Sequence, residues 1–110
     1  MIVGAAVLEL RIQGSHSLKQ KRGVVQSVIR RVRNRFNLAV SEVGGQDTWQ
    51  RSVVGMAAAG SDRDRVRQVL HSAVNFVEGL HLAEVRGSDI EILELPLADG
   101  EAFPSWEFQE

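Results

Sequence analysis

The residues of this sequence that could do chemistry are mostly its cations. Between Leu10 and Ser41 there are eight Lys or Arg residues and no Asp or Glu. Like charges three or four positions apart on a helix repel one another, so this arrangement is expected where an anionic partner compensates it. Lys and Arg along a helix can follow a nucleic-acid backbone, because each phosphate they neutralise releases counterions. The predicted phosphate-contacting residues are Lys19, Lys21, Arg22, Arg30, Arg31, Arg33 and Arg35, with Arg11 and His16 at the edge of the patch.

No other group of residues has the spacing of a catalytic or metal site. His16, His71 and His81 have no carboxylate or Cys at ligand spacing, and no nucleophile motif connects Ser, His and Asp. Gly44-Gly45-Gln46 matches the tripeptide with which release factors hydrolyse peptidyl-tRNA. In a hairpin loop, however, two glycines are explained by a turn that needs positive φ. The sequence therefore predicts a protein that is not an enzyme and has no cofactor and no metal.

Size and composition predict one small globular domain. The chain has 110 residues, 44% of them hydrophobic and 25% charged, as in ordinary soluble domains. No apolar run approaches the roughly 18 residues of a membrane span. The absence of cysteine excludes disulfides. With no basic leader before the first apolar run, a cytoplasmic location is expected.

Charge is distributed unevenly along the chain. Residues 1–51 hold nine Lys or Arg against three Asp or Glu, a net +6, and residues 52–110 hold four against eleven, a net −7. This division favours either a basic face for a polyanion or two faces that attract each other between subunits.

The elements that must position the cations begin with a strand over residues 2–13. Leu8, Leu10 and Ile12 alternate with polar residues, which is typical of a sheet with one wet face. Residues 2–7 are apolar on both sides, so a second subunit could cover one of those faces. Ser17 and Gln20 form a capping-box pattern that starts an amphipathic helix. Its buried stripe is predicted to consist of Leu18, Val25, Ile29, Val32 and Phe36, with Val28 beside it, and its cations form two flanking ridges.

The rest of the chain completes a plait. Residues 38–43 and 49–59 are strand candidates joined by a glycine-bearing loop, which indicates a hairpin. Ser61 or Asp62 then caps a second helix, and residues 82–95 form a last strand. The helix is expected to bury Val66, Val69, Leu70, Ala73, Val77 and Leu80. The order β-α-β-β-α-β predicts an α+β, ferredoxin-like domain over residues 1–96, with a four-stranded antiparallel sheet and two helices on one face.

Residues 97–110 form an acidic tail that carries Phe103, Trp106 and Phe108. A purely disordered tail seldom holds so many aromatic residues. Docking on the open sheet face or on another subunit is one interpretation, and a frayed tail is the other.

Four short stretches resemble a known family: GSHSLKQKR at 14–22, RNRFN at 33–37, AVSEV at 39–43 and QDTWQR at 46–51. They are similar to the YlxP-like family of small bacterial proteins of unknown function, over roughly residues 1–80. The resemblance implies the same ferredoxin-like fold. Genes of this family often lie beside those for translation initiation and ribosome-binding factors, which implies a role with RNA or the ribosome. Its motifs fall on Ser17, Leu18, Lys19, Lys21 and Arg22, and on Glu42, Asp47, Trp49 and Arg51, and bring no catalytic residue.

Two functions are therefore expected from the sequence. The first is a non-enzymatic module that binds RNA or a ribosomal particle through the basic helix, where Trp49 could stack on a base or simply pack beneath the hairpin. The alternative is a dimerisation or regulatory module that binds a second copy, a protein partner or a small ligand at the open sheet face. That face would include Val3, Ala5 and Val7. Either Val54, Met56 and Ala58, or Val53 and Ala57, would extend it, because the sequence leaves the parity of this strand open.

Overall fold

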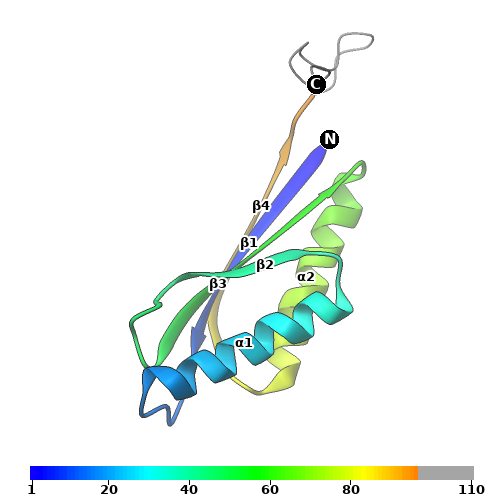
Figure 1. Ribbon diagram of the computed structural model, residues 1–110. Helices are drawn as coiled ribbons and strands as arrows, with labels where there is room; N and C mark the ends of the chain where they lie inside the picture. The colour runs from blue at the N-terminus through cyan, green and yellow to red at the C-terminus, as the bar shows by residue number, and fades with distance from the viewer. Residues whose placement is uncertain (97–110) are drawn as a thin grey trace, which may run out of the picture.

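The computed structural model describes residues 1–96, which form six elements and one sheet. The elements are β1 (Ile2–Arg11), α1 (Leu18–Arg35), β2 (Ala39–Gly44), β3 (Arg51–Gly60), α2 (Arg63–Leu80) and β4 (Glu84–Glu94). The sheet is antiparallel throughout, with strand order β2-β3-β1-β4. Both helices lie on one side of it (Figure 1). The predicted ferredoxin-like plait is thus confirmed, while the predicted tail, 97–110, lies outside the described residues.

Strand β1 is the centre of the sheet and sets which residues face the helices. It pairs with β3 on one side and β4 on the other along its whole length. Its even-numbered residues from Ile2 to Leu10 are buried under the helices, whereas its odd-numbered residues face away from them. Because Ala5 pairs with Ala57, the parity of β3 follows. Val53 and Ala57 lie on the open face, whereas Val54, Met56 and Ala58 lie on the helix side.

Each helix begins at the predicted kind of cap. The Ser17 hydroxyl accepts a hydrogen bond from the Gln20 amide at 3.1 Å. The Gln20 side chain accepts one from the His16 amide at 2.7 Å, so the reciprocal bond of the capping box is displaced by one residue. At α2 the cap is Asp62, whose carboxylate accepts from the amides of Asp64 and Arg65. Neither described helix is both long and apolar enough to cross a bilayer.

The helices divide the sheet between them. Helix α1 packs against β2, while α2 packs against β1, β3 and β4. Helix α2 lies very close to the sheet at Gly4, where an added Cβ would lie 2.6 Å from Val66 and 2.7 Å from Leu70. The buried residues of α2 are Val66, Leu70, Ala73, Val74 and Val77. Val69 and Leu80, predicted to be buried, are partly exposed, and Val74 takes their place in the core.

Candidate nucleic-acid interface

Six of the seven cations predicted on α1 are exposed on the surface of the helix. Within residues 1–96 none of these six forms an ion pair with a carboxylate. The helix also has no acidic residue in its first turn. Their charge is therefore not neutralised by the described part of the chain. The exposed cations are Lys19, Arg22, Arg30, Arg31, Arg33 and Arg35.

Four of these cations form one line along α1, which we call the outer ridge: Lys19, Arg22, Arg30 and Arg33. At about 100° per residue they fall on the same flank of the helix. This flank borders the edge strand β2, because the Arg33 guanidinium donates a hydrogen bond to the carbonyl oxygen of Val40. With a rise of 1.5 Å per residue, the ridge is about 21 Å long. Such a line of cations can contact several phosphates at once.

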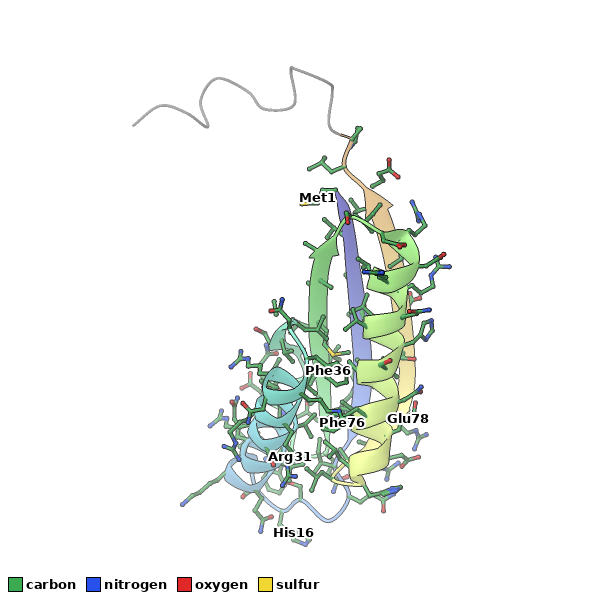
Figure 2. The ribbon with its side chains drawn as sticks, turned by 90° about the vertical axis from the view of Figure 1, so that its right-hand side faces the viewer. Met1, His16, Arg31, Phe36, Phe76 and Glu78 are labelled. Atoms are coloured by element: carbon green, nitrogen blue, oxygen red, sulfur yellow. The ribbon has the colours of Figure 1, made fainter. Side chains whose placement is uncertain are left out.

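The other two cations, Arg31 and Arg35, lie on the flank that faces α2. The guanidinium of Arg35 is 5.3 Å from the ring centroid of Phe76 and 6.0 Å from that of Phe36. The two rings meet edge to face between the helices, with centroids 5.6 Å apart (Figure 2). The Arg31 Nε donates to the Ser27 hydroxyl at 3.2 Å. Aromatic and hydroxyl partners hold these guanidinium groups in place without neutralising their charge.

Lys21 is not a surface residue, which corrects the prediction that it contacts phosphate. Its side chain is 0% exposed, and its Nζ lies 2.7 Å from the Glu42 carboxylate. The same Nζ donates to the carbonyl oxygens of Gly45, at 2.6 Å, and Gln46, at 3.4 Å. The Ser52 hydroxyl also donates to Glu42, at 2.6 Å. A buried charge is tolerated only when it is paired and hydrogen-bonded in this way.

Sequence reasoning missed this cluster, although a signal for it exists. Lys21 precedes Val25, Val28 and Val32 by four, seven and eleven residues, so it belongs to the buried stripe of α1. Its partner Glu42 lies 21 residues away on β2, on the face that the helices cover. The stripe alone indicates that Lys21 is buried, whereas the pairing with Glu42 depends on how α1 packs against β2.

Arg11 and His16 were both predicted at the edge of the basic patch, but they lie in different places relative to the outer ridge. Arg11 ends β1 opposite Arg51 of β3 and Glu84 of β4. The alternation of β1 places it on the open face, whereas α1 packs on the other face, so its assignment to the edge of the α1 patch is corrected. His16 is exposed in the turn before α1, at the end of the molecule where the outer ridge begins (Figure 2).

The loop between β2 and β3 is fixed to α1 by Lys21. Gly45 has a φ of +73°, and a Cβ there would lie 2.9 Å from the carbonyl oxygen of Arg51, so the turn requires glycine. The Thr48 amide donates to the Gly45 carbonyl at 3.1 Å and closes the turn. Trp49 is 52% exposed, so it does not pack beneath the hairpin. The loop therefore presents an aromatic ring that could stack on a base.

A family model described as "Protein of unknown function (DUF503)" matches residues 3–90. The chain belongs to the DUF503 family. It is also 40% identical over 77 residues to the protein named "Uncharacterized protein YlxP" of Bacillus subtilis (strain 168). The matched residues are 70% of this chain and 84% of that protein. The resemblance to YlxP-like proteins is therefore confirmed. Neither the DUF503 description nor that name assigns an activity.

Two solved structures resemble this DUF503 protein remotely. One is SnoaB, a cofactor-independent oxygenase from Streptomyces nogalater, with 11% identity, 87% of this chain and 95% of that chain covered, and a TM-score of 0.46. Another is a REP-associated tyrosine transposase bound to a REP hairpin, with 10% identity, coverage of 86% and 57%, and a TM-score of 0.40. At such scores neither carries an argument about function.

Proposed function

We propose that this DUF503 protein is a non-enzymatic RNA-binding module of ribosome assembly or translation, which contacts the phosphates of structured RNA through α1. The observation that carries the proposal is the set of six exposed cations on α1, none of which is paired with a carboxylate of residues 1–96. The outer ridge supplies the main contacts. Arg31 and Arg35, on the flank toward α2, add to the positive field.

Binding depends on the local positive charge of α1, and not on the net charge of the chain. The chain has a formal net charge of −1, so a polyanion would not be attracted to the molecule as a whole. The side chains of the outer ridge are exposed, so they can contact a phosphate backbone. Contacts to phosphates position a protein on a nucleic acid but do not read its base sequence. We therefore expect weak sequence preference and strong salt dependence. With four to six phosphate contacts, the slope of log K against log salt is about −3 to −5.

RNA is favoured over other polyanions by the resemblance to YlxP-like proteins, whose genes often lie beside those for translation factors. Exposed Trp49, on the loop that Lys21 holds against α1, adds an aromatic ring of the kind that stacks on unpaired bases. The alternative function, a dimerisation module, is compatible with this one, because the open sheet face and α1 lie on opposite sides of the sheet (Figure 1).

Co-sedimentation with ribosomal subunits, together with titration of an RNA hairpin at several salt concentrations, tests the proposal. In the double variant Arg22→Glu/Arg30→Glu the charge of the outer ridge is reversed at two positions that make no described side-chain hydrogen bond. We expect a loss of affinity of at least about tenfold and a salt slope reduced by about 2. Arg33 is left intact because its bond to Val40 supports the edge of the sheet.

The matched control is Arg63→Glu/Arg67→Glu, which makes the same charge change on exposed positions of α2. It should bind RNA nearly as well as the unchanged protein. Equal losses in the two double variants would mean that only net charge matters, and unchanged binding by Arg22→Glu/Arg30→Glu would refute the assignment to α1. Circular dichroism and thermal unfolding show whether each variant is folded.

A further inference from the structure

Within the described residues, 1–96, both helices cover the same face of the sheet. In Figure 1 the sheet is seen nearly edge-on, and α1 and α2 both lie on the same side of it. Within residues 1–96 nothing packs against the other face. A sheet that contacts water on one face normally alternates apolar and polar residues, with the polar residues on the wet side. The open face of this protein departs from that rule.

The middle of the open face is apolar and small. In register across the strands, Ala5 lies between Ala57 and Glu91, and Val7 lies between Gly55 and Asp89. Val7 is 44% exposed, and further apolar side chains are more exposed still, with Val43 at 56% and Leu93 at 57%. We give the name open-face patch to Gly55 and the apolar residues around it on this face: Val3, Ala5, Val7, Ala39, Val43, Val53, Ala57, Ala59 and Leu93.

Small residues make the centre of this patch flat. An added Cβ at Gly55 would lie 3.0 Å from Val43 Cγ1, so the Val43 side chain leans over the glycine on this face. Next to it Ala57 and Ala5 offer only methyl groups. A flat sheet surface of this kind can pack against another sheet, at a spacing of about 10 Å, without large side chains holding the two apart.

Charged groups border the open-face patch along β4 and at one end of the face. Asp89 and Glu91 lie along the edge strand β4. At one end of the face the Arg51 guanidinium is 3.2 Å from the Glu9 carboxylate. An apolar centre with a polar rim is the anatomy of a protein interface. A two-fold interface brings the same patch from both subunits together, so an uncharged centre avoids like-charge contacts.

The dimensions of the face agree with pairing of two copies. Strands β1 and β3 each have ten residues in a four-stranded sheet. At about 3.3 Å per residue and 4.8 Å between strands, the face measures roughly 33 by 19 Å, or about 600 Å². Pairing of the two whole faces, charged rims included, removes roughly 1,200 Å² from water, which reaches the lower end of the range for specific interfaces.

We infer that the open-face patch binds a second copy of this chain, giving a symmetric dimer in which two sheets pack face to face and the four helices lie outside. The partner is a copy rather than another protein because the patch is self-complementary: apolar and flat at its centre, with both signs of charge at its rim. This inference is independent of RNA binding, since the outer ridge lies on the other side of the sheet.

The test is the mass of the full chain in solution over a dilution series, by light scattering or sedimentation equilibrium. The unchanged protein should be a dimer at micromolar concentrations. Ala57→Glu places two carboxylates near the centre of the interface, and like charges there should weaken association at least about 100-fold. The matched control Asn75→Glu adds the same charge on the exposed side of α2 and should remain a dimer.

A second variant guards against a folding defect at Ala57. Val7→Gln/Leu93→Gln changes two side chains that are already about half exposed in the protomer, so the fold should be retained. It adds no charge, and it should also shift the protein toward monomer. A monomeric unchanged protein at all concentrations, or a dimer that persists in both variants, overturns the inference. So does a dimer that dissociates with Asn75→Glu instead.

Discussion

Lys19 and Lys21 are two residues apart on α1 and lie in opposite environments. Lys19 is exposed on the outer ridge, while Lys21 is fully buried against Glu42 and the carbonyl oxygens of the β2–β3 loop. The same residue type therefore lies on the exposed surface at one position and in a buried ion pair at the other. The two lysines give a matched pair for separating these effects.

We expect Lys21→Met to destabilise the protein without changing how it binds RNA. The substitution leaves the Glu42 carboxylate, which is 15% exposed, without its ammonium partner. Removing one member of a buried pair typically costs about 3 kcal/mol or more, although Ser52 and the partial exposure of Glu42 reduce the loss here. Urea unfolding measures the free energy of unfolding, and titration of the folded variant measures the salt slope of binding, which should be unchanged.

Lys19→Met should behave in the opposite way. Its free energy of unfolding should stay within about 0.5 kcal/mol of the unchanged protein, since Lys19 has no described ion pair or side-chain hydrogen bond. Its salt slope should fall by about 1, because one phosphate contact is lost. If Lys21→Met lowered the slope as well, the buried lysine would have to emerge when RNA binds.

Residue environments were the least predictable feature of the candidate site. The seven cations could be assigned to α1 from sequence, and six of them are exposed. Lysine is almost never fully buried unless it is paired, so a surface position was the natural expectation for Lys21. Its partner Glu42 belongs to another element, and sequence does not show how α1 packs against β2. Likewise, Arg11 is near α1 in sequence, but the alternation of β1 places it on the open face.

The helices and strands were predicted more completely than the environments of single side chains. Two periodicities, 3.6 for the helices and 2 for the strands, together with the glycine turns and polar caps, determine the order β-α-β-β-α-β and hence the plait. The parity of β3 could not be predicted, because Val53 and Val54 are both apolar and either could face the core. Only pairing with β1 decides it, through contacts such as Leu8 with Val54.

Alanine substitutions at two glycines, Gly4 in β1 and Gly23 in α1, test how tightly the helices are packed at these positions. At Gly4 an added Cβ would lie within 3 Å of Val66, Leu70 and Ile92, so Gly4→Ala should push α2 away from the sheet and cost about 1–3 kcal/mol. At Gly23, within α1, an added Cβ meets nothing within 4 Å. Gly23→Ala should therefore stabilise the protein by about 0.5–1 kcal/mol through helix propensity.

Thermal and urea unfolding of the two alanine variants measure this contrast directly. Opposite signs are the expected result. If both variants were stabilised, α2 would have to stand farther from β1 than the structure places it. RNA binding should change little in Gly23→Ala, because the outer-ridge side chains keep their positions on the same helix.

The whole molecule combines two surfaces on opposite sides of one sheet. The cations of α1 lie on the helix side, and the open-face patch lies on the other. If two copies pair through the open-face patch, each outer ridge lies on an outer surface of the dimer. With one sheet-to-sheet and two helix-to-sheet spacings of about 10 Å each, the two α1 layers are about 30 Å apart and face away from each other.

This geometry predicts that dimerisation adds no avidity for a short RNA. A hairpin that fits one outer ridge cannot reach the other across the paired sheets, so each protomer should bind one hairpin independently. The charge-neutral variant Val7→Gln/Leu93→Gln leaves the outer ridge intact, and as a monomer it should bind a short hairpin with an affinity within about threefold of that of the dimer. Isothermal titration of the two proteins gives both the stoichiometry and the affinity per protomer. A stoichiometry of one hairpin per dimer, with a loss of tenfold or more in the monomer, would mean that both ridges meet the same RNA, and hence that the two ridges lie closer together than face-to-face packing of the sheets places them.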